Sequence, residues 1–369
     1  MERAARCVFL LAAVAALGER AQADGKFYYG ETVPPDIPYQ RALIIFHEGS
    51  ETLVLQSKYE LPQSADTNSL GWVVPVPAVP EIASVDAEAA TSFFFSASLR
   101  TSPNVTVISD YVGCIAVCFL LGSIGFLLLC LVEYPFLSKI GLSKAAWKRR
   151  LSNGLIVALV AFVLSMGAVP HLGSVRGVEV IKAEKAGIYD VKVIRGENAE
   201  AILSWLKENG FAFGDSDVHV FEDYVNRKWC FVVAKVQPDP ETQEHRIVSE
   251  GMVAPLILKF ETDKAIYPLA LTSIVGVSTE VLLYTLSQSK LSCGKRLTLR
   301  HAGSSKPANL IARLLETADP KTKALFENVP ESMTLCKFKK KLSPDQMKKD
   351  LEFELAADND PYVEKKIVW

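Results

Sequence analysis

The strongest pattern along the chain is a pair of long apolar runs that contain no charged residue. They occupy residues 112–132 and 151–169. At about 1.5 Å of rise per helical residue, these runs would reach about 31 and 28 Å, close to the thickness of the hydrocarbon core of a bilayer. The pattern predicts two transmembrane helices that form a hairpin.

The link between the two runs, residues 133–150, is rich in positive charge. Against one acid, Glu133, it carries five basic residues: Lys139, Lys144, Lys148, Arg149 and Arg150. Short loops with such an excess lie on the cytoplasmic side of a membrane. We therefore expect a multi-pass protein of the plasma (inner) membrane, whose segments 24–111 and 170–369 fold on the extracytoplasmic side.

Residues 1–23 have the pattern of a secretory signal peptide. Arg3 and Arg6 precede an apolar run at residues 7–18, and Ala21 and Ala23 make a small-x-small cleavage site. This order of basic, apolar and small residues predicts cleavage after Ala23. An uncleaved signal anchor is the alternative, and it would leave the placement of the folded segments unchanged.

Shorter periodic patterns predict the elements of the folded segments. Alternating or wholly apolar runs predict strands, at residues 41–46, 52–56, 70–76, 189–194, 229–236, 252–260, 266–274, 279–286, 291–300 and 335–342. Apolar residues at helical spacing predict helices, at residues 84–99, 199–210, 215–226, 309–316 and 321–327. Residues 343–346 read as a capping box with proline at the first helical position.

These elements predict an α+β fold, in which a mixed or antiparallel sheet packs against helices and is interrupted by the transmembrane hairpin. Segments 24–111 and 170–369 are expected to share one sheet. Residues 41–46 are apolar on both faces and need cover, which we expect from the helical stripe of Ile202, Leu203 and Leu206. The lysine row in residues 335–342 predicts an exposed edge strand, with contact to anionic lipid or a cell-wall polymer as the alternative.

Charge and cysteine content narrow the functional classes. A net charge of -2 gives no electrostatic reason to expect nucleic acid as a partner. Of the seven cysteines, only Cys230, Cys293 and Cys336 would lie on the oxidising side. At most one disulfide is possible among three thiols, and the sequence leaves open whether any two pair. Without a CxxC pair, neither a zinc site nor a redox centre is expected.

No catalytic, phosphate-binding or dinucleotide-binding motif occurs in the chain. The five histidines are scattered without ligand spacing, at His47, His171, His219, His245 and His301. Asp215 and Asp217 stand at the start of a predicted helix, where acids are favoured without any catalytic role. No metal, no cofactor and no specific catalytic residue is therefore predicted, and an enzymatic activity is not favoured.

Several stretches together have the order and character of one family, at residues 41–46, 52–56, 72–81, 189–193, 204–211, 267–272 and 342–347. They resemble the bacterial family called domain of unknown function 2330. The resemblance implies a secreted or membrane-tethered bacterial domain without established activity, so no functional residue follows from it. Two features depart from the family: residues 24–28 replace a stretch rich in cysteine and glycine, and the apolar hairpin falls between the two family halves.

The preferred functional hypothesis is a membrane-anchored extracytoplasmic domain that binds or assembles with a protein or polymer of the cell envelope, and that contacts lipid through its hairpin. The alternative is an envelope hydrolase whose carboxylates come together from distant segments. A deep pocket with several carboxylates or histidines of perturbed pKa would favour the enzyme. A flat or groove-like apolar patch would favour binding.

Overall fold

A computed structural model describes residues 26–29, 36–60, 70–107, 177–211, 213, 217–237 and 252–368. One compact unit contains the chain up to Asn104 together with residues 175–365. A second unit, residues 105–174 and 366–369, is described only where strands β6 (Asn104–Val107) and β18 (Lys365–Val368) pair. Everything that follows concerns the first unit.

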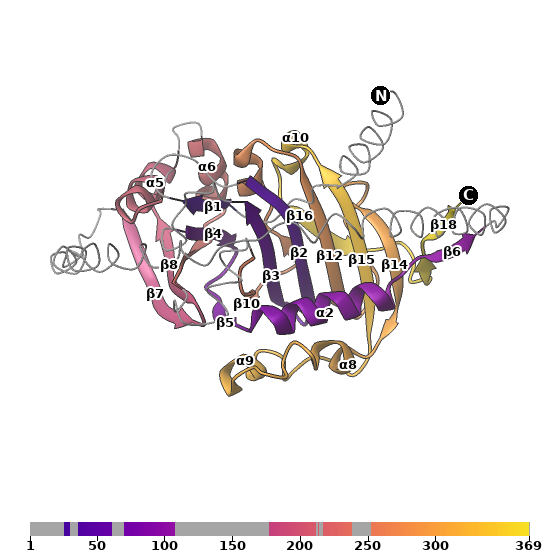
Figure 1. Cartoon of the computed structure of the whole chain (residues 1–369). Coiled ribbons are helices and arrows are strands. Elements are labelled where there is room, and N and C mark those ends of the chain that lie inside the picture. Colours follow the sequence, from indigo (N-terminus) through magenta and orange to yellow (C-terminus); the bar gives the residue numbers. More distant parts are fainter. Residues whose placement is uncertain are drawn as a thin grey trace, which may run out of the picture. The chain divides into compact units, whose positions relative to one another are not determined.

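The larger sheet of this unit has eight strands, drawn from both sides of the undescribed middle segment (Figure 1). Its order is β17 (Tyr362–Val363), β14 (Thr298–Ser305), β15 (Met333–Leu342), β12 (Thr279–Ser287), β2 (Asp36–His47), β3 (Ser50–Glu60), β10 (Leu256–Glu261) and β5 (Glu81–Ser84). Strands β2 and β12 run parallel, whereas the other neighbours are antiparallel.

Two further sheets pack on this one. A five-stranded antiparallel sheet has the order β1 (Lys26–Tyr29), β4 (Leu70–Val76), β9 (Cys230–Val236), β8 (Tyr189–Gly196) and β7 (Val178–Ala186). A three-stranded sheet has the order β11 (Ala265–Tyr267), β16 (Leu351–Leu355) and β13 (Leu291–Ser292). Both large sheets therefore combine strands from the early and the late segment, as the sequence predicts.

Helices cover the outer faces. They are α2 (Ala87–Arg100), α5 (Ala199–Glu208), α6 (Val218–Asn226), α8 (Pro307–Ile311), α9 (Pro320–Ala324), α10 (Pro344–Met347) and the 3-10 helix η4 (Ala270–Val275). Figure 1 shows α2 crossing the strands of the larger sheet, with α8 and α9 beside it. Asp86 caps α2 by accepting hydrogen bonds from the backbone N–H groups of Glu88 and Ala89.

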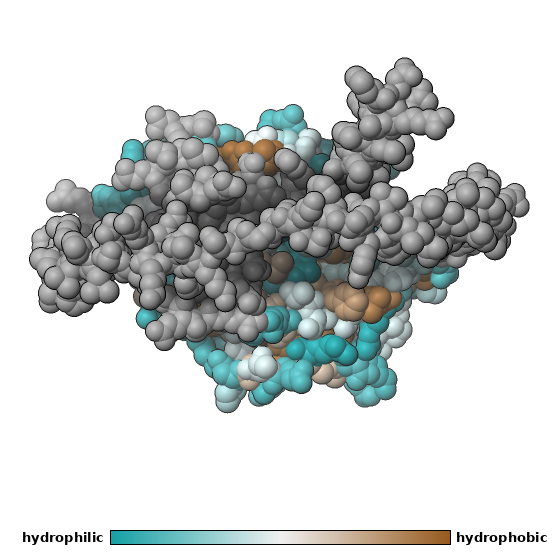
Figure 2. All heavy atoms as spheres, in the orientation of Figure 1, coloured by the Kyte–Doolittle hydropathy of each residue, from teal (hydrophilic) through white to brown (hydrophobic). Residues whose placement is uncertain are grey.

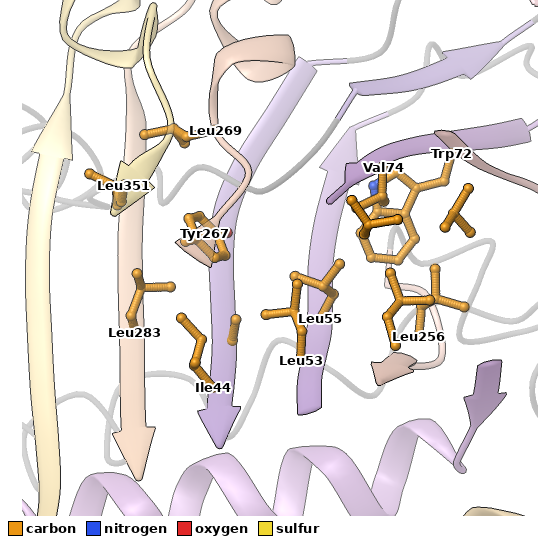
Figure 3. Close-up of a cluster of buried hydrophobic side chains, with 14 of the residues drawn as sticks. Ile44, Leu53, Leu55, Trp72, Val74, Leu256, Tyr267, Leu269, Leu283 and Leu351 are labelled. Atoms are coloured by element: carbon orange, nitrogen blue, oxygen red, sulfur yellow. The ribbon is translucent and has the colours of Figure 1, made fainter. Parts of the chain in front are cut away.

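Strict alternation along the strands divides the core into three clusters. On the inner faces, side chains of all three sheets meet, among them Leu53, Trp72 and Tyr267 (Figure 3). On the outer face of the larger sheet, residues such as Leu43 and Tyr284 pack under α2, α8 and α9. The outer face of the five-stranded sheet packs against α5, α6 and η4. The central strands, such as β2 and β4, thus alternate between two apolar environments.

The predicted α+β class is wrong, because sheet dominates the fold. The described residues form eighteen strands but only six α-helices and one 3-10 helix. Residues 266–274 were predicted as one strand. In the structure, strand β11 ends at Tyr267 and the 3-10 helix η4 begins at Ala270. The lysine row of β15 does not mark an edge either, since β12 and β14 flank this strand on its two sides.

The membrane prediction is also corrected. The predicted signal peptide 1–23, the spans 112–132 and 151–169, and the link 133–150 all lie outside the described residues. In the part of the chain that the structure describes, no helix is long and apolar enough to cross a membrane. The structure therefore does not support the predicted location as a multi-pass protein of the inner membrane.

The elements that pack on the two faces of β2 also differ from those predicted. The stripe on α5 packs Ile202 and Leu206 against the five-stranded sheet. Strand β2 instead buries Leu43 and Ile45 under α2 and turns Ala42 and Ile44 toward the inner cluster. The amphipathic pattern of α5 identified its buried face correctly, but a periodicity cannot specify which sheet that face meets.

A turn, a helix end and a capping box match the predictions from the sequence. The turn between β2 and β3 places Glu48 and Gly49 at positive φ, which suits a two-residue hairpin connection. Helix α5 ends as expected, with Gly210 at a φ of +85°. At the start of α10, Ser343 and Gln346 form the predicted capping box.

The end of α6 yields a stability prediction. Lys228 has a φ of 60° there, and the N–H groups of Lys228 and Trp229 donate to the carbonyls of Val225 and Tyr224. A lysine in this left-handed position is strained by its Cβ. Lys228→Gly should therefore raise the free energy of unfolding by about 1 kcal/mol, measured by denaturant titration.

The matched control is Lys207→Gly within α5. Lys207 has helical backbone in the last turn of α5, where glycine should lower the free energy of unfolding by about 0.5–1 kcal/mol. If both substitutions lowered it, the strain assigned to Lys228 would be wrong.

Candidate functional site

The chemistry-bearing residues noted in the sequence do not assemble into a catalytic centre. Cys230, Cys293 and Cys336 are buried free thiols, and burial raises the pKa of each. His47, His219 and His301 lie on three separate elements, β2, α6 and β14. His171, His245 and Asp215 fall outside the described residues. Across the described ranges, no group of three histidine, cysteine, aspartate or glutamate side chains could hold a metal ion.

The best candidate for binding is a hollow of about 590 Å³ with a strongly basic wall, which we call the basic hollow. Its lining residues come from the turn after β13, the end of β15, and α10 with the residues that follow it: Lys295, Arg296, Lys340, Leu342, Asp345, Gln346, Lys348 and Lys349. Five cations thus face a single acid, although the whole chain carries a net charge of -2. Such clustering creates a local positive potential.

Arg296 lines the basic hollow and holds the segment that carries several of its lysines. Its guanidinium donates to the backbone carbonyls of Gln346 (2.9 Å), Lys349 (2.6 Å) and Asp350. These carbonyls belong to the end of α10 and to the residues after it, where helical partners run out, so the arginine satisfies them. Arg296 is therefore occupied in fixing the segment that carries the lysines.

The lysines of the basic hollow are less engaged. Lys348 pairs with Asp345 at 2.7 Å, and this contact lowers the pKa of the Asp345 carboxyl. Lys340 donates to the backbone carbonyl of Lys295 at 3.1 Å. Within the described structure, Lys295, Lys340 and Lys349 form no ion pair, so their charge is available to an incoming anion.

Asp350 ties the basic hollow to the core. One of its carboxylate oxygens accepts hydrogen bonds from the Tyr224 hydroxyl (2.5 Å) and from the backbone N–H groups of Leu269 (2.8 Å) and Ala270 (3.0 Å). The other oxygen accepts from Arg227 at 2.9 Å. Burial and the neighbouring Asp350 carboxylate raise the pKa of the Tyr224 phenol. This buried network anchors the start of β16 and hence the lysine-bearing segment before it.

A second hollow, of about 650 Å³, shares Arg227 with this network. Arg227 and Trp229 form part of its wall, with the guanidinium 4.1 Å from the indole ring centre. Its carboxylates are Glu261, Asp263 and Glu352, of which Glu352 pairs with Lys264 at 3.4 Å. A third hollow, of about 190 Å³, lies near His47 and Lys259.

The most strongly perturbed carboxyl lines none of these three hollows. Glu51 on β3 is fully buried and accepts a hydrogen bond from the backbone N–H of Ile266 at 2.7 Å, while its second oxygen has no hydrogen-bond partner. Burial raises the pKa of Glu51 well above its ordinary value, and the hydrogen bond opposes that rise only in part. The group holds β11 against β3, and its place in the core does not suit a general acid.

Comparison with known proteins identifies one family. The model of the family described as "Uncharacterized protein conserved in bacteria (DUF2330)" matches residues 40–354. No curated protein matches the chain significantly.

Two solved structures show a distant likeness. The crystal structure of baculovirus P35 is 11% identical, with a TM-score of 0.30 over 87% of this chain and 98% of that one. A mutated baculovirus P35 after caspase cleavage is 10% identical, with a TM-score of 0.29 over 72% of this chain and 75% of that one. Scores this low do not establish a shared fold.

The network at Asp350 generates one prediction. Asp350→Asn should lower the free energy of unfolding by about 3 kcal/mol, because it places an amide nitrogen against the Arg227 guanidinium and leaves that charge poorly compensated. Denaturant titration measures the loss. The control Asp345→Asn alters an exposed pair and should leave stability unchanged. Equal effects of the two substitutions would contradict the anchoring role of Asp350.

Glu51 generates a prediction about pH. Because its pKa is raised in the folded state, its contribution to stability is fully present below the unfolded value of about 4.5 and is lost as pH rises through the folded pKa. Glu51→Gln keeps the hydrogen-bond acceptor without the charge. The variant should be more stable than the wild type at alkaline pH, by an amount that grows from pH 5 upward in thermal unfolding.

The exposed Glu261→Gln on β10 is the matched control for Glu51→Gln and should show no such trend. A Glu51→Gln variant that lost stability equally at every pH would contradict the raised pKa.

Proposed function

For this chain, which belongs to the bacterial family described as uncharacterised conserved proteins (DUF2330), we propose a role in binding rather than in catalysis. The basic hollow receives an anionic group of a cell-envelope polymer or protein. The observation that carries the proposal is the set of lysines, Lys295, Lys340 and Lys349, that have no ion pair in the described structure and line one hollow. A secretory signal pattern at residues 1–23 supports the envelope as the place of action.

The shape of the site supports binding of a charged group. Hydrogen bonds of Arg296 to Gln346 and Lys349, and of Asp350 to Leu269, hold the segment before Asp350 in place. The lysines of this segment are therefore preorganised. Preorganisation lowers the entropy cost of binding. On the visible part of one face, apolar residues lie in separate patches among hydrophilic ones (Figure 2). Leu342 is the one apolar residue that lines the basic hollow, so charge is a better basis for recognition there than an apolar surface.

The hydrolase alternative lacks a comparable observation. It needs an acid and a base of suitably shifted pKa that face one cavity. In the described ranges the carboxyl with the strongly raised pKa, Glu51, is enclosed in the core. One carboxylate of the second hollow, that of Glu352, pairs with Lys264, and Glu51 is not among the residues that line this hollow. We therefore do not assign a reaction.

Binding of labelled inorganic polyphosphate at low ionic strength tests the proposal. The double substitution Lys295→Gln and Lys349→Gln should weaken binding about tenfold, because it removes two of the lysine charges that lack an ion pair. Added salt should also lower the affinity of the wild-type protein for polyphosphate. The control pair Lys207→Gln and Lys323→Gln removes two exposed lysines elsewhere and should leave affinity unchanged.

Two results would contradict the proposal. One is wild-type protein that does not bind polyphosphate at low salt. The other is equal loss of affinity in the test and control pairs, which would indicate a general charge effect. Single-stranded DNA as a second probe checks the expected lack of a nucleic-acid partner, which a clear preference for DNA over polyphosphate would overturn.

A further inference from the structure

The third hollow, of about 190 Å³, lies on the outer face of the eight-stranded sheet. The neighbouring strands β2, β3 and β10 each contribute lining residues two positions apart, and residues at this spacing place their side chains on one face of a sheet. Ile45 and Leu325 line the hollow and belong to the apolar cluster of the outer face. Leu325, Asn328 and Val329, which follow α9, complete its wall.

Two opposite charges in the third hollow have no partner among the described residues. Lys259 and Glu261 lie two positions apart on β10, with about 7 Å between their Cα atoms. In the described structure, neither side chain forms an ion pair or a hydrogen bond. The other two charge-bearing residues of the hollow lie against each other, since Nε2 of His47 is 3.6 Å from Oε1 of Glu48. The hollow therefore presents one cation and one anion to a ligand.

Thr52 adds a hydroxyl beside the lysine. It pairs in register with Lys259 across β3 and β10, so the two side chains are neighbours on the same face. Thr52 is 5% exposed, lines the hollow, and has no hydrogen-bond partner for its hydroxyl among the described residues. Buried polar groups are normally hydrogen-bonded. An unpaired hydroxyl in the wall of a hollow, next to an unpaired ammonium group, therefore indicates a place for a ligand with acceptor oxygens.

We propose that the third hollow binds a small α-amino acid in its zwitterionic form. The ammonium group of Lys259 and the hydroxyl of Thr52 donate to the carboxylate of the ligand, and the carboxylate of Glu261 accepts from its ammonium group. The apolar side chains of Ile45, Leu325 and Val329 face the side chain of the ligand. This site shares no residue with the basic hollow and does not depend on the function assigned to that hollow.

Size and charge limit the ligand. A cavity of about 150 Å³ holds one molecule of benzene, and alanine has the same number of non-hydrogen atoms as benzene. The third hollow, at about 190 Å³, therefore has room for alanine but not for an aromatic amino acid. Acetate lacks the ammonium group and ethylamine lacks the carboxylate, so each of them meets only one of the two charges. Both should bind more weakly than alanine.

Equilibrium dialysis of the full chain against isotopically labelled L-alanine tests the proposal. We expect saturable binding, which acetate or ethylamine displaces less effectively than unlabelled alanine at the same concentration. Lys259→Gln should weaken the binding about tenfold, because the charged donor to the ligand carboxylate is lost. The control Lys185→Gln removes a strand lysine that lines none of the three hollows, and it should leave the affinity unchanged.

Thr52→Val removes the hydroxyl and keeps the shape of the side chain. It should weaken alanine binding about threefold without lowering the midpoint of thermal unfolding, because a buried hydroxyl without a partner does not stabilise the fold. The proposal would be overturned by the absence of saturable alanine binding, by equal affinity in Lys259→Gln and Lys185→Gln, or by unchanged affinity in Thr52→Val. Displacement by acetate as effective as that by alanine would also overturn it, because the anionic group alone would then account for binding.

Discussion

The burial of strand β2 on both faces is the constraint on which the rest of the fold depends. Ala42 and Ile44 require apolar cover on one face, and Leu43 and Ile45 require it on the other. Helix α2 supplies one cover and comes from the same early segment. The inner cover and the parallel neighbour β12 come from late segments. Because no early element can satisfy both faces, the two parts of the chain must fold together.

The same architecture explains where charge collects. Apolar clusters occupy three layers, so polar side chains gather at boundaries between helix and sheet and where loops leave the sheets. The basic hollow forms at a loop boundary, where α10 and Asp350 fix a lysine-bearing segment. The lysine-bearing segment of the basic hollow is thus held in place by the core. Arg41 on β2 and Lys337 on β15 lie at the boundary between α2 and the larger sheet, where they contact Thr91 and Ser98.

The errors of sequence-based prediction share a physical origin. The lysines of β15 suggested an edge because a row of charge usually blocks pairing, but here Lys339 pairs with Glu280 and Lys337 lies against α2. The α+β class was wrong because several strands were not predicted, among them β7 and the part of β14 beyond residue 300, which pairs with β15 and β17. The lining residues of the basic hollow come from two separate segments, 295–296 and 340–349, so no local motif revealed it.

The sequence by itself determined the local structure: the hairpin between β2 and β3, the span of β4, the caps of α5 and α10, and the family. These features depend on neighbouring residues, whose backbone preferences and periodicity act over a few positions. Only the tertiary structure decided which faces meet, the interior place of β15, the network at Asp350 and the basic hollow. These depend on contacts between residues far apart in the chain, such as Arg227 with Asp350, and such contacts exist only once the sheets have paired.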